Sequence, residues 1–160
     1  MTIHEVKVNI NEETMVTDVV NPIVITYPQL LLSLAKELLD TKCLTEFART
    51  PYGLSVISSH MACEVAAARS MREAHKNNGM SEKDISKELE EFFFSLKGKK
   101  SRTTFKKLTG YDVENAHFWT DYVISCDCRN DIIHNSKVVV ELDAKKAIEV
   151  AEKFVAFLGQ

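Results

Sequence analysis

From Gln29 to Leu158 the apolar residues recur every three or four positions, which is the spacing of amphipathic helices. Prolines, glycines and polar clusters divide this pattern into successive segments. We therefore expect an all-α, up-and-down bundle of four or five helices over residues 27–160. The expected inward faces are Leu31, Leu34, Ala35, Leu38 and Leu39; Leu54, Ile57, Met61, Val65 and Ala68; Ile85, Leu89, Phe92, Phe93 and Leu96; Phe118, Trp119, Tyr122, Val123 and Cys126; and Ala147, Ile148, Ala151, Phe154, Val155 and Leu158.

Residues that start and stop helices mark the expected boundaries. Thr50 and Pro51 suit an amino-terminal cap and first turn, and residues 77–79, Asn-Asn-Gly, suit the end of that helix near Lys76. Ser81 begins a near capping box for the next helix. Asp143 is expected to cap the last helix, after a short extended link of three valines.

Residues 1–26 follow a different pattern. Val6, Val8 and Ile10 alternate with polar residues, and Val19, Val20 and residues 23–25 form a second β-branched cluster. We expect an extended amino-terminal arm or hairpin that precedes the helical bundle. Such an arm either covers an edge of the core or pairs with a strand of a partner chain, and the sequence leaves both possibilities open.

Composition adds limits to this picture. With 160 residues, of which 45% are hydrophobic, the chain is long enough to bury one core, which favours a single domain. The net charge of −3 gives no overall basic bias, so any nucleic-acid site must be local. Apolar runs fall short of the roughly 20 residues that span a bilayer, and the amino terminus lacks an apolar signal segment. We expect a soluble, cytoplasmic protein with no membrane partner.

The four cysteines, Cys43, Cys63, Cys126 and Cys128, lie within apolar helical patterns. Such thiols are typically buried and reduced. Zinc sites prefer two residues between paired cysteines, whereas Cys126 and Cys128 are separated by one and point to nearly opposite helix faces. We therefore expect neither a metal nor another cofactor.

The segment 97–107 contains six basic residues and no acidic residue. They are Lys97, Lys99, Lys100, Arg102, Lys106 and Lys107. A charge run of this kind is often a solvated loop. It also suits a flexible loop that binds a polyanion such as RNA, with Phe105 available to stack on a base.

Glu64 falls within the expected apolar face of the second helix, seven residues after Ile57 and three after Met61. An inward carboxylate needs a partner, and an inward arginine such as Arg129 would provide a charge-assisted pair. The alternative is that Glu64 lies at the edge of the face and reaches solvent.

The stretch from Cys126 to Asn135 closes a long amphipathic segment that begins near Asp112. Arg129 supplies a planar guanidinium suited to phosphate, and His134 supplies a titratable imidazole. Five residues turn a regular helix by about 500°, so these two side chains differ by about 140° in direction. Because the next residues, Asn135 and Ser136, favour a helix end, we expect His134 at or near that end or at a kink.

The run Arg129-Asn130-x-x-x-His134 resembles the motif of the HEPN superfamily. These are all-helical domains whose motif is Arg, four to six residues and His, commonly with Asn, Asp or His after the Arg. The resemblance covers this motif and the helical layout from Tyr27 to Leu158. It implies a homodimer in which the motif helices face each other and the paired Arg and His side chains form a metal-independent ribonuclease site.

The resemblance also implies roles for single residues. His134 would be the acid and base, Arg129 the phosphate clamp, and Asn130 would orient a hydroxyl or the histidine. Glu64, at a position where HEPN domains often carry glutamate, would hold Arg129. RNA would be the substrate, in a toxin–antitoxin or antiviral defence context with an antitoxin or another regulatory protein.

Two other functions stay open at this point. One is a HEPN-like dimeric binding module for nucleotide, RNA or protein that lacks catalysis. The other is a small helical adaptor unrelated to HEPN, in which His134 is an ordinary surface or capping residue.

Overall fold

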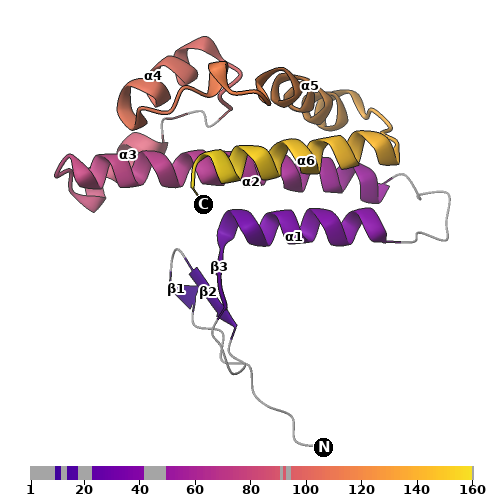
Figure 1. Cartoon of the computed structure of the whole chain (residues 1–160), viewed down its shortest axis with the longest axis horizontal. Helices are drawn as coiled ribbons and strands as arrows, with labels where there is room; N and C mark the ends of the chain where they lie inside the picture. Colours follow the sequence, from indigo (N-terminus) through magenta and orange to yellow (C-terminus); the bar gives the residue numbers. More distant parts are fainter. Residues whose placement is uncertain are drawn as a thin grey trace, which may run out of the picture.

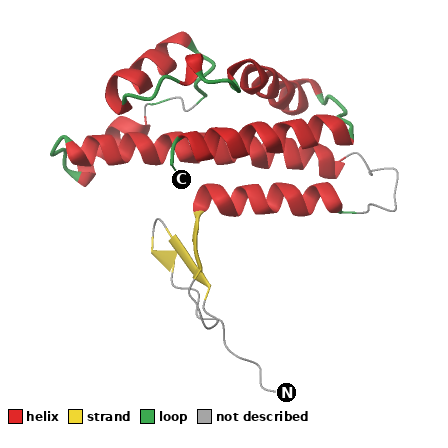
Figure 2. Ribbon diagram, in the orientation of Figure 1, coloured by secondary structure: helices red, strands yellow, loops and turns green. Residues whose placement is uncertain are grey.

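The computed structural model describes residues 10–11, 14–17, 23–41, 50–90, 92 and 95–159. Within these residues six α-helices pack into an all-α bundle, preceded by a small antiparallel sheet (Figures 1 and 2). The predicted fold class is confirmed. The expectations for Val6, Val8, Val19, Val20, Cys43 and Phe93 lie outside the described residues.

The amino-terminal sheet consists of β1 (Ile10–Asn11), β2 (Thr14–Thr17) and β3 (Ile23–Thr26), in the order β1-β2-β3. Thr17 pairs with Ile23, and the register continues to Thr14 opposite Thr26. β3 leads directly into α1 (Tyr27–Asp40), where the side chain of Gln29 accepts the N–H of Thr26 at 3.1 Å. Figure 1 shows the sheet below α1, away from the other helices, so the predicted arm projects from the bundle.

α1 and α2 (Thr50–Asn77) lie side by side (Figure 1). Their contact is made by small residues: Ser55 Oγ donates to the carbonyl oxygen of Ala35 at 2.7 Å, and Ser58 Oγ donates to that of Leu31 at 3.1 Å. Small side chains let the two backbones approach closely, and the carbonyls satisfy the buried hydroxyls.

This contact overturns the predicted inward face of α2. Leu54 is 47% exposed and Met61 is 41% exposed, whereas the serines and alanines of the helix are largely buried. The prediction was wrong because it ranked positions by apolar size, while α2 buries its small side chains. Leu54 and Met61 instead form an apolar stripe on the surface.

The remaining helices are α3 (Glu82–Glu90), α4 (Lys99–Thr109), α5 (Trp119–Asn135) and α6 (Glu141–Phe157), with the short 3-10 helix η1 (Val113–Asn115) between α4 and α5. In Figure 1, α2 and α6 lie between α1 on one side and α4 and α5 on the other. The basic segment that was expected to be a loop is therefore largely the helix α4. Gly110, at φ 79°, ends it in the left-handed conformation that glycine adopts without strain.

The core is richest in aromatic side chains between α5 and α6. Phe118, Tyr122 and Phe154 are at most 1% exposed, and the rings of Tyr122 and Phe154 stack with centroids 5.0 Å apart. The predicted inward faces of these two helices thus supply the centre of the core. Asp143 differs from its predicted role as the cap, because it lies in the first turn of α6 and accepts the N–H of Val140 at 3.4 Å.

Cys63 and Cys126 are free and buried, and Cys128 is free and half-buried. None of the helices in the described part of the chain is long and apolar enough to cross a membrane.

Candidate functional site

The carboxyl end of α5 carries the motif. The helix ends at Asn135, and the next residue, Ser136, adopts the left-handed conformation at φ 51°. The N–H groups of Ser136 and Lys137 both donate to the carbonyl oxygen of Asp131. His134 lies in the last turn, near the helix end where the sequence placed it, and its side chain is exposed.

Arg129 lies more than one turn earlier and is half-buried. Its Nη1 donates to Oδ1 of the neighbouring Asn130 at 3.1 Å, so these two motif side chains do contact each other. Its Nε is buried and has no hydrogen-bond partner among the described residues. Asn130 therefore restrains the guanidinium rather than the imidazole of His134.

Glu64 is half-buried, with 27% of its side chain exposed. Its direct partner is His60, one turn earlier on α2, whose Nε2 lies 3.2 Å from Oε1 of Glu64. Burial raises the pKa of Glu64, but the hydrogen bond and charge of His60, together with the positive charge of Arg129, outweigh burial and lower the pKa. Among the described residues Glu64 therefore pairs with His60, and the expected direct pair between Glu64 and Arg129 is not formed.

His60 is the site residue that the sequence analysis missed. It is 3% exposed, its Nδ1 lies 3.8 Å from Sγ of Cys126, and its ring stacks on Tyr122 with centroids 6.0 Å apart. Burial lowers the pKa of His60, but hydrogen bonds and charge interactions with Cys126 and Glu64 more than offset it and raise the pKa to about 9. The available signal was the four-residue spacing between His60 and Glu64, which places both on one side of a helix.

Within one chain the imidazole of His134 and the guanidinium of Arg129 lie on different faces of α5. Arg129 is half-buried, and its positive charge helps to lower the pKa of Glu64 on α2. His134 is exposed and is rotated about 140° around the helix from Arg129. Within a single chain these two side chains therefore do not lie on one face of the helix.

Three of the six residues of the basic segment pair with acidic residues from other parts of the chain. Lys97 pairs with Asp127, Lys106 with Asp112, and Arg102 with Glu114. Phe105 is fully buried, so the expectation that it stacks on a base is wrong. Lys99, Lys100 and Lys107 are exposed along α4.

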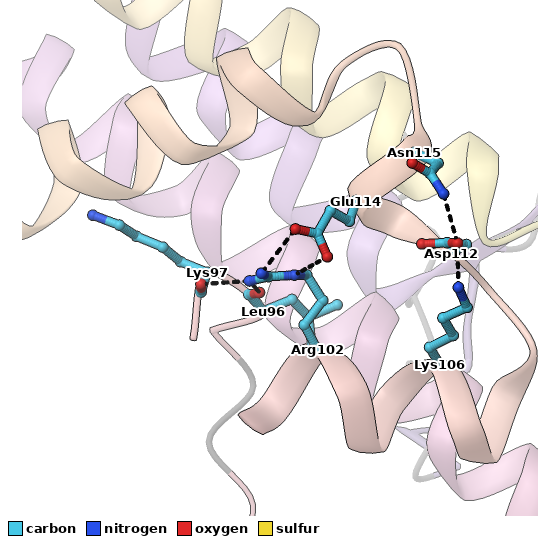
Figure 3. Close-up of polar contacts among 7 residues, drawn as sticks. All are labelled: Leu96, Lys97, Arg102, Lys106, Asp112, Glu114 and Asn115. Carbon is cyan, nitrogen blue, oxygen red and sulfur yellow. Dashed lines mark hydrogen bonds and ion pairs between the residues drawn. The ribbon is translucent and has the colours of Figure 1, made fainter. Parts of the chain in front are cut away.

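Arg102 makes the most extensive of these contacts (Figure 3). Its Nε and Nη2 donate to the two carboxylate oxygens of Glu114 at 2.9 and 3.0 Å. Its Nη1 donates to the carbonyl oxygens of Lys97 and Leu96 at 2.7 and 3.3 Å, and the guanidinium lies 4.9 Å from the ring centroid of Trp119. These contacts indicate that Arg102 ties the start of α4 to η1 and α5, rather than facing a ligand.

A groove of about 410 Å³ lies between α5 and α6. Five acidic side chains and two lysines line it: Asp121, Asp127, Asp131, Asp143, Glu149, Lys137 and Lys146. Neither Arg129 nor His134 lines this groove. Its excess of carboxylates makes it unsuited to RNA.

No group of three or more His, Cys, Asp or Glu side chains arranged to hold a metal ion occurs in the described residues. Comparisons with protein-family models, with curated proteins and with solved structures find no match for this chain.

Proposed function

We propose that this chain is a metal-independent endoribonuclease of HEPN type that acts as a homodimer. The observation that carries the proposal is the placement of the motif at the end of α5, where His134 is exposed and the guanidinium of Arg129 donates to Asn130. The all-α bundle is the fold that the resemblance implies. A cytoplasmic toxin or defence context, with an antitoxin or another regulatory protein as partner, is part of the same proposal.

The exposed stripe on α2 supports a composite site. Leu54 and Met61 lie between the side of α2 that meets α1 through Ser58 and the side that meets α5 through Glu64. On α5, His134 is exposed in the last turn, where a partner chain can reach it. A two-fold contact along the stripe would bury the apolar side chains and bring the two motifs to one interface.

Such an interface would supply both proton-transfer groups that RNA cleavage needs. The oxygen of the 2′-hydroxyl bonds to phosphorus while one His134 takes its proton. The bond from phosphorus to the 5′-oxygen breaks, and the other His134 gives that oxygen a proton. The guanidinium of Arg129 stabilises the charge on the phosphoryl oxygens, and the products are a 2′,3′-cyclic phosphate and a 5′-hydroxyl.

The direct test is incubation of the purified protein with generic RNA in EDTA, followed by analysis of the product ends. We expect internal cleavage with 2′,3′-cyclic phosphate ends. A dimer that binds RNA without cutting it would instead establish the non-catalytic binding module. A chain that does neither would be assigned to the adaptor class.

Dimerisation can be tested separately. We expect a homodimer with an interface of roughly 1,600 Å² of total buried surface. Changing Leu54 and Met61 to glutamate should produce monomers that lose RNA cleavage, since charge would be buried at the centre of the contact. The measurement is sedimentation velocity at micromolar concentration.

The matched control for dimerisation is Ile124→Glu, because Ile124 is 61% exposed but lines the groove between α5 and α6. This variant should remain a dimer. If the wild-type protein sediments as a monomer, the proposed composite site is wrong.

The basic surface of α4 gives another prediction. Changing the exposed Lys99, Lys100 and Lys107 to glutamine should weaken RNA binding at low salt and reduce the slope of log affinity against log salt by about 0.7 per lost phosphate contact. The melting temperature should stay near that of the wild type, because these side chains are exposed.

The control for this prediction removes the same charge elsewhere, through glutamine at the exposed Lys83, Lys87 and Lys146. Salt titrations of RNA binding compare the two triple variants. Equal slopes would mean that α4 is merely a solvated helix.

A further inference from the structure

We infer that the groove between α5 and α6 binds a linear aliphatic polyamine, a chain of methylene groups with ammonium groups at its ends and along its length. The inference is independent of the proposed nuclease, because neither Arg129 nor His134 lines this groove. Its volume of about 410 Å³ lies within the range of roughly 300–1,000 Å³ that is typical of small-molecule sites.

The two walls of the groove run antiparallel. α5 ends at Asn135 and α6 begins at Glu141 after a short link, so the start of each helix lies toward the end of the other (Figure 1). Asp121 lines the groove near the start of α5, and Asp143 lines it near the start of α6. The two carboxylates therefore lie toward opposite ends of the groove.

Asp121 and Asp143 also have no ion-pair partner among the described residues. Asp121 is exposed, and the half-buried Asp143 accepts only the N–H of Val140, at 3.4 Å. The other three acidic residues of the lining each pair with a lysine: Asp127 with Lys97, Asp131 with Lys137, and Glu149 with Lys153. Negative charge without a counterion is therefore concentrated at the two ends of the groove.

Ser125 is an independent indication of a ligand. Its side chain is 9% exposed and lines the groove, and its hydroxyl makes no hydrogen bond to another described residue. Buried hydroxyls usually have a partner, as those of Ser55 and Ser58 do on α2. An ammonium group in the groove would donate to the oxygen of Ser125.

The spread of the charges favours a polyamine over a metal ion. No three groups that could hold a metal gather in the described part of the chain. Asp131, at the same end of the groove as Asp143, lies ten residues after Asp121, or about 15 Å along α5. Fully extended spermine, a tetraamine, spans about 16 Å between its terminal nitrogens. One such molecule can therefore reach both ends of the groove.

The middle of the groove suits the methylene groups of the same ligand. Ile124, Ala147 and Val150 line it, and Ile124 is 61% exposed. Methylene groups that cover these side chains remove apolar surface from water. A peptide would also need partners for its backbone groups, whereas α5 and α6 bond their own backbone groups internally.

The first measurement is calorimetric titration of the wild-type protein with spermine, in the absence of RNA and at constant ionic strength. Putrescine, a short diamine, reaches only one end of the groove. It should bind at least about tenfold more weakly, because it loses both an ion pair and apolar contact. In an NMR spectrum, spermine should shift the amide signal of Ser125.

The second measurement changes the charge at the ends of the groove. The double variant Asp121→Asn, Asp143→Asn should bind spermine at least about fivefold more weakly. Asparagine at position 143 still offers an oxygen to the N–H of Val140. Lys146, an exposed lysine of the lining, opposes the ligand, so Lys146→Gln should instead strengthen binding.

The matched control is the double variant Glu37→Gln, Glu73→Gln, which removes the same charge from exposed positions on α1 and α2. It should bind spermine like the wild type, and circular dichroism checks that both double variants are folded. Equal losses in the two variants, or putrescine and Mg²⁺ binding as tightly as spermine, would show attraction by overall charge and overturn the inference. A tetralysine peptide that binds where spermine does not would also overturn it and indicate a protein partner.

Discussion

His134→Ala is expected to slow RNA cleavage by roughly 100-fold or more, because a positioned acid or base typically contributes about 10²–10⁴ to the rate. His134 is exposed in the last turn of α5, so its removal leaves no cavity in the core. Folding should therefore be unchanged. The measurement is the initial rate of cleavage of a labelled RNA in EDTA, combined with sedimentation of the variant.

Arg129 should contribute to cleavage by binding the phosphate and not by transferring a proton. Arg129→Ala is expected to lose a comparable amount of cleavage, and Arg129→Lys should restore little, because a point charge does not replace a planar fork of donors. His117→Ala is the matched control, since His117 is another exposed histidine. If a dimeric His134→Ala protein cuts RNA at the wild-type rate, the nuclease proposal fails and the non-catalytic module replaces it.

The helical bundle was predictable because its strongest signals are local. Large apolar side chains recur with helical spacing in α5 and α6, and the same residues form the aromatic core around Tyr122 and Phe154. The end of α5 was equally predictable, because Asn135 and Ser136 favour a helix end, although the left-handed conformation of Ser136 was not predicted.

The orientation of α2 was not predictable in this way. Its sequence offers an apolar stripe with Leu54 and Met61 and another face of serines and alanines. The second face is buried because Ser55 and Ser58 find carbonyl acceptors on α1. Those acceptors belong to another helix, so the periodicity of α2 alone does not reveal them.

The candidate site was only partly predictable, because some of its contacts join residues that are far apart in the sequence. Arg129, Asn130 and His134 stand in one short motif, whereas the sequence left open whether Glu64 points inward or reaches solvent. The contact between His60 and Cys126 joins residues 66 positions apart, and the partners of the basic segment, Asp112, Glu114 and Asp127, lie beyond it in the chain. Counting charges within a segment misses such partners.

Arg102 gives the largest expected effect on stability. Arg102→Ala should lower the free energy of unfolding by about 2–3 kcal/mol, because it leaves the carbonyls of Leu96 and Lys97 without their donor. The lost contact with Trp119 adds to this effect. Denaturant unfolding followed by circular dichroism measures the change.

Two controls separate the contacts of Arg102. Glu114→Gln should cost less than about 1 kcal/mol, because its side chain is 55% exposed and water screens the ion pair. Lys107→Ala, an exposed change on the same helix, should cost still less. If Arg102→Ala instead unfolds like the wild type and binds RNA more weakly, Arg102 belongs to the RNA-binding surface that the sequence predicted. The carbonyl contacts would then contribute little to holding α4 in place.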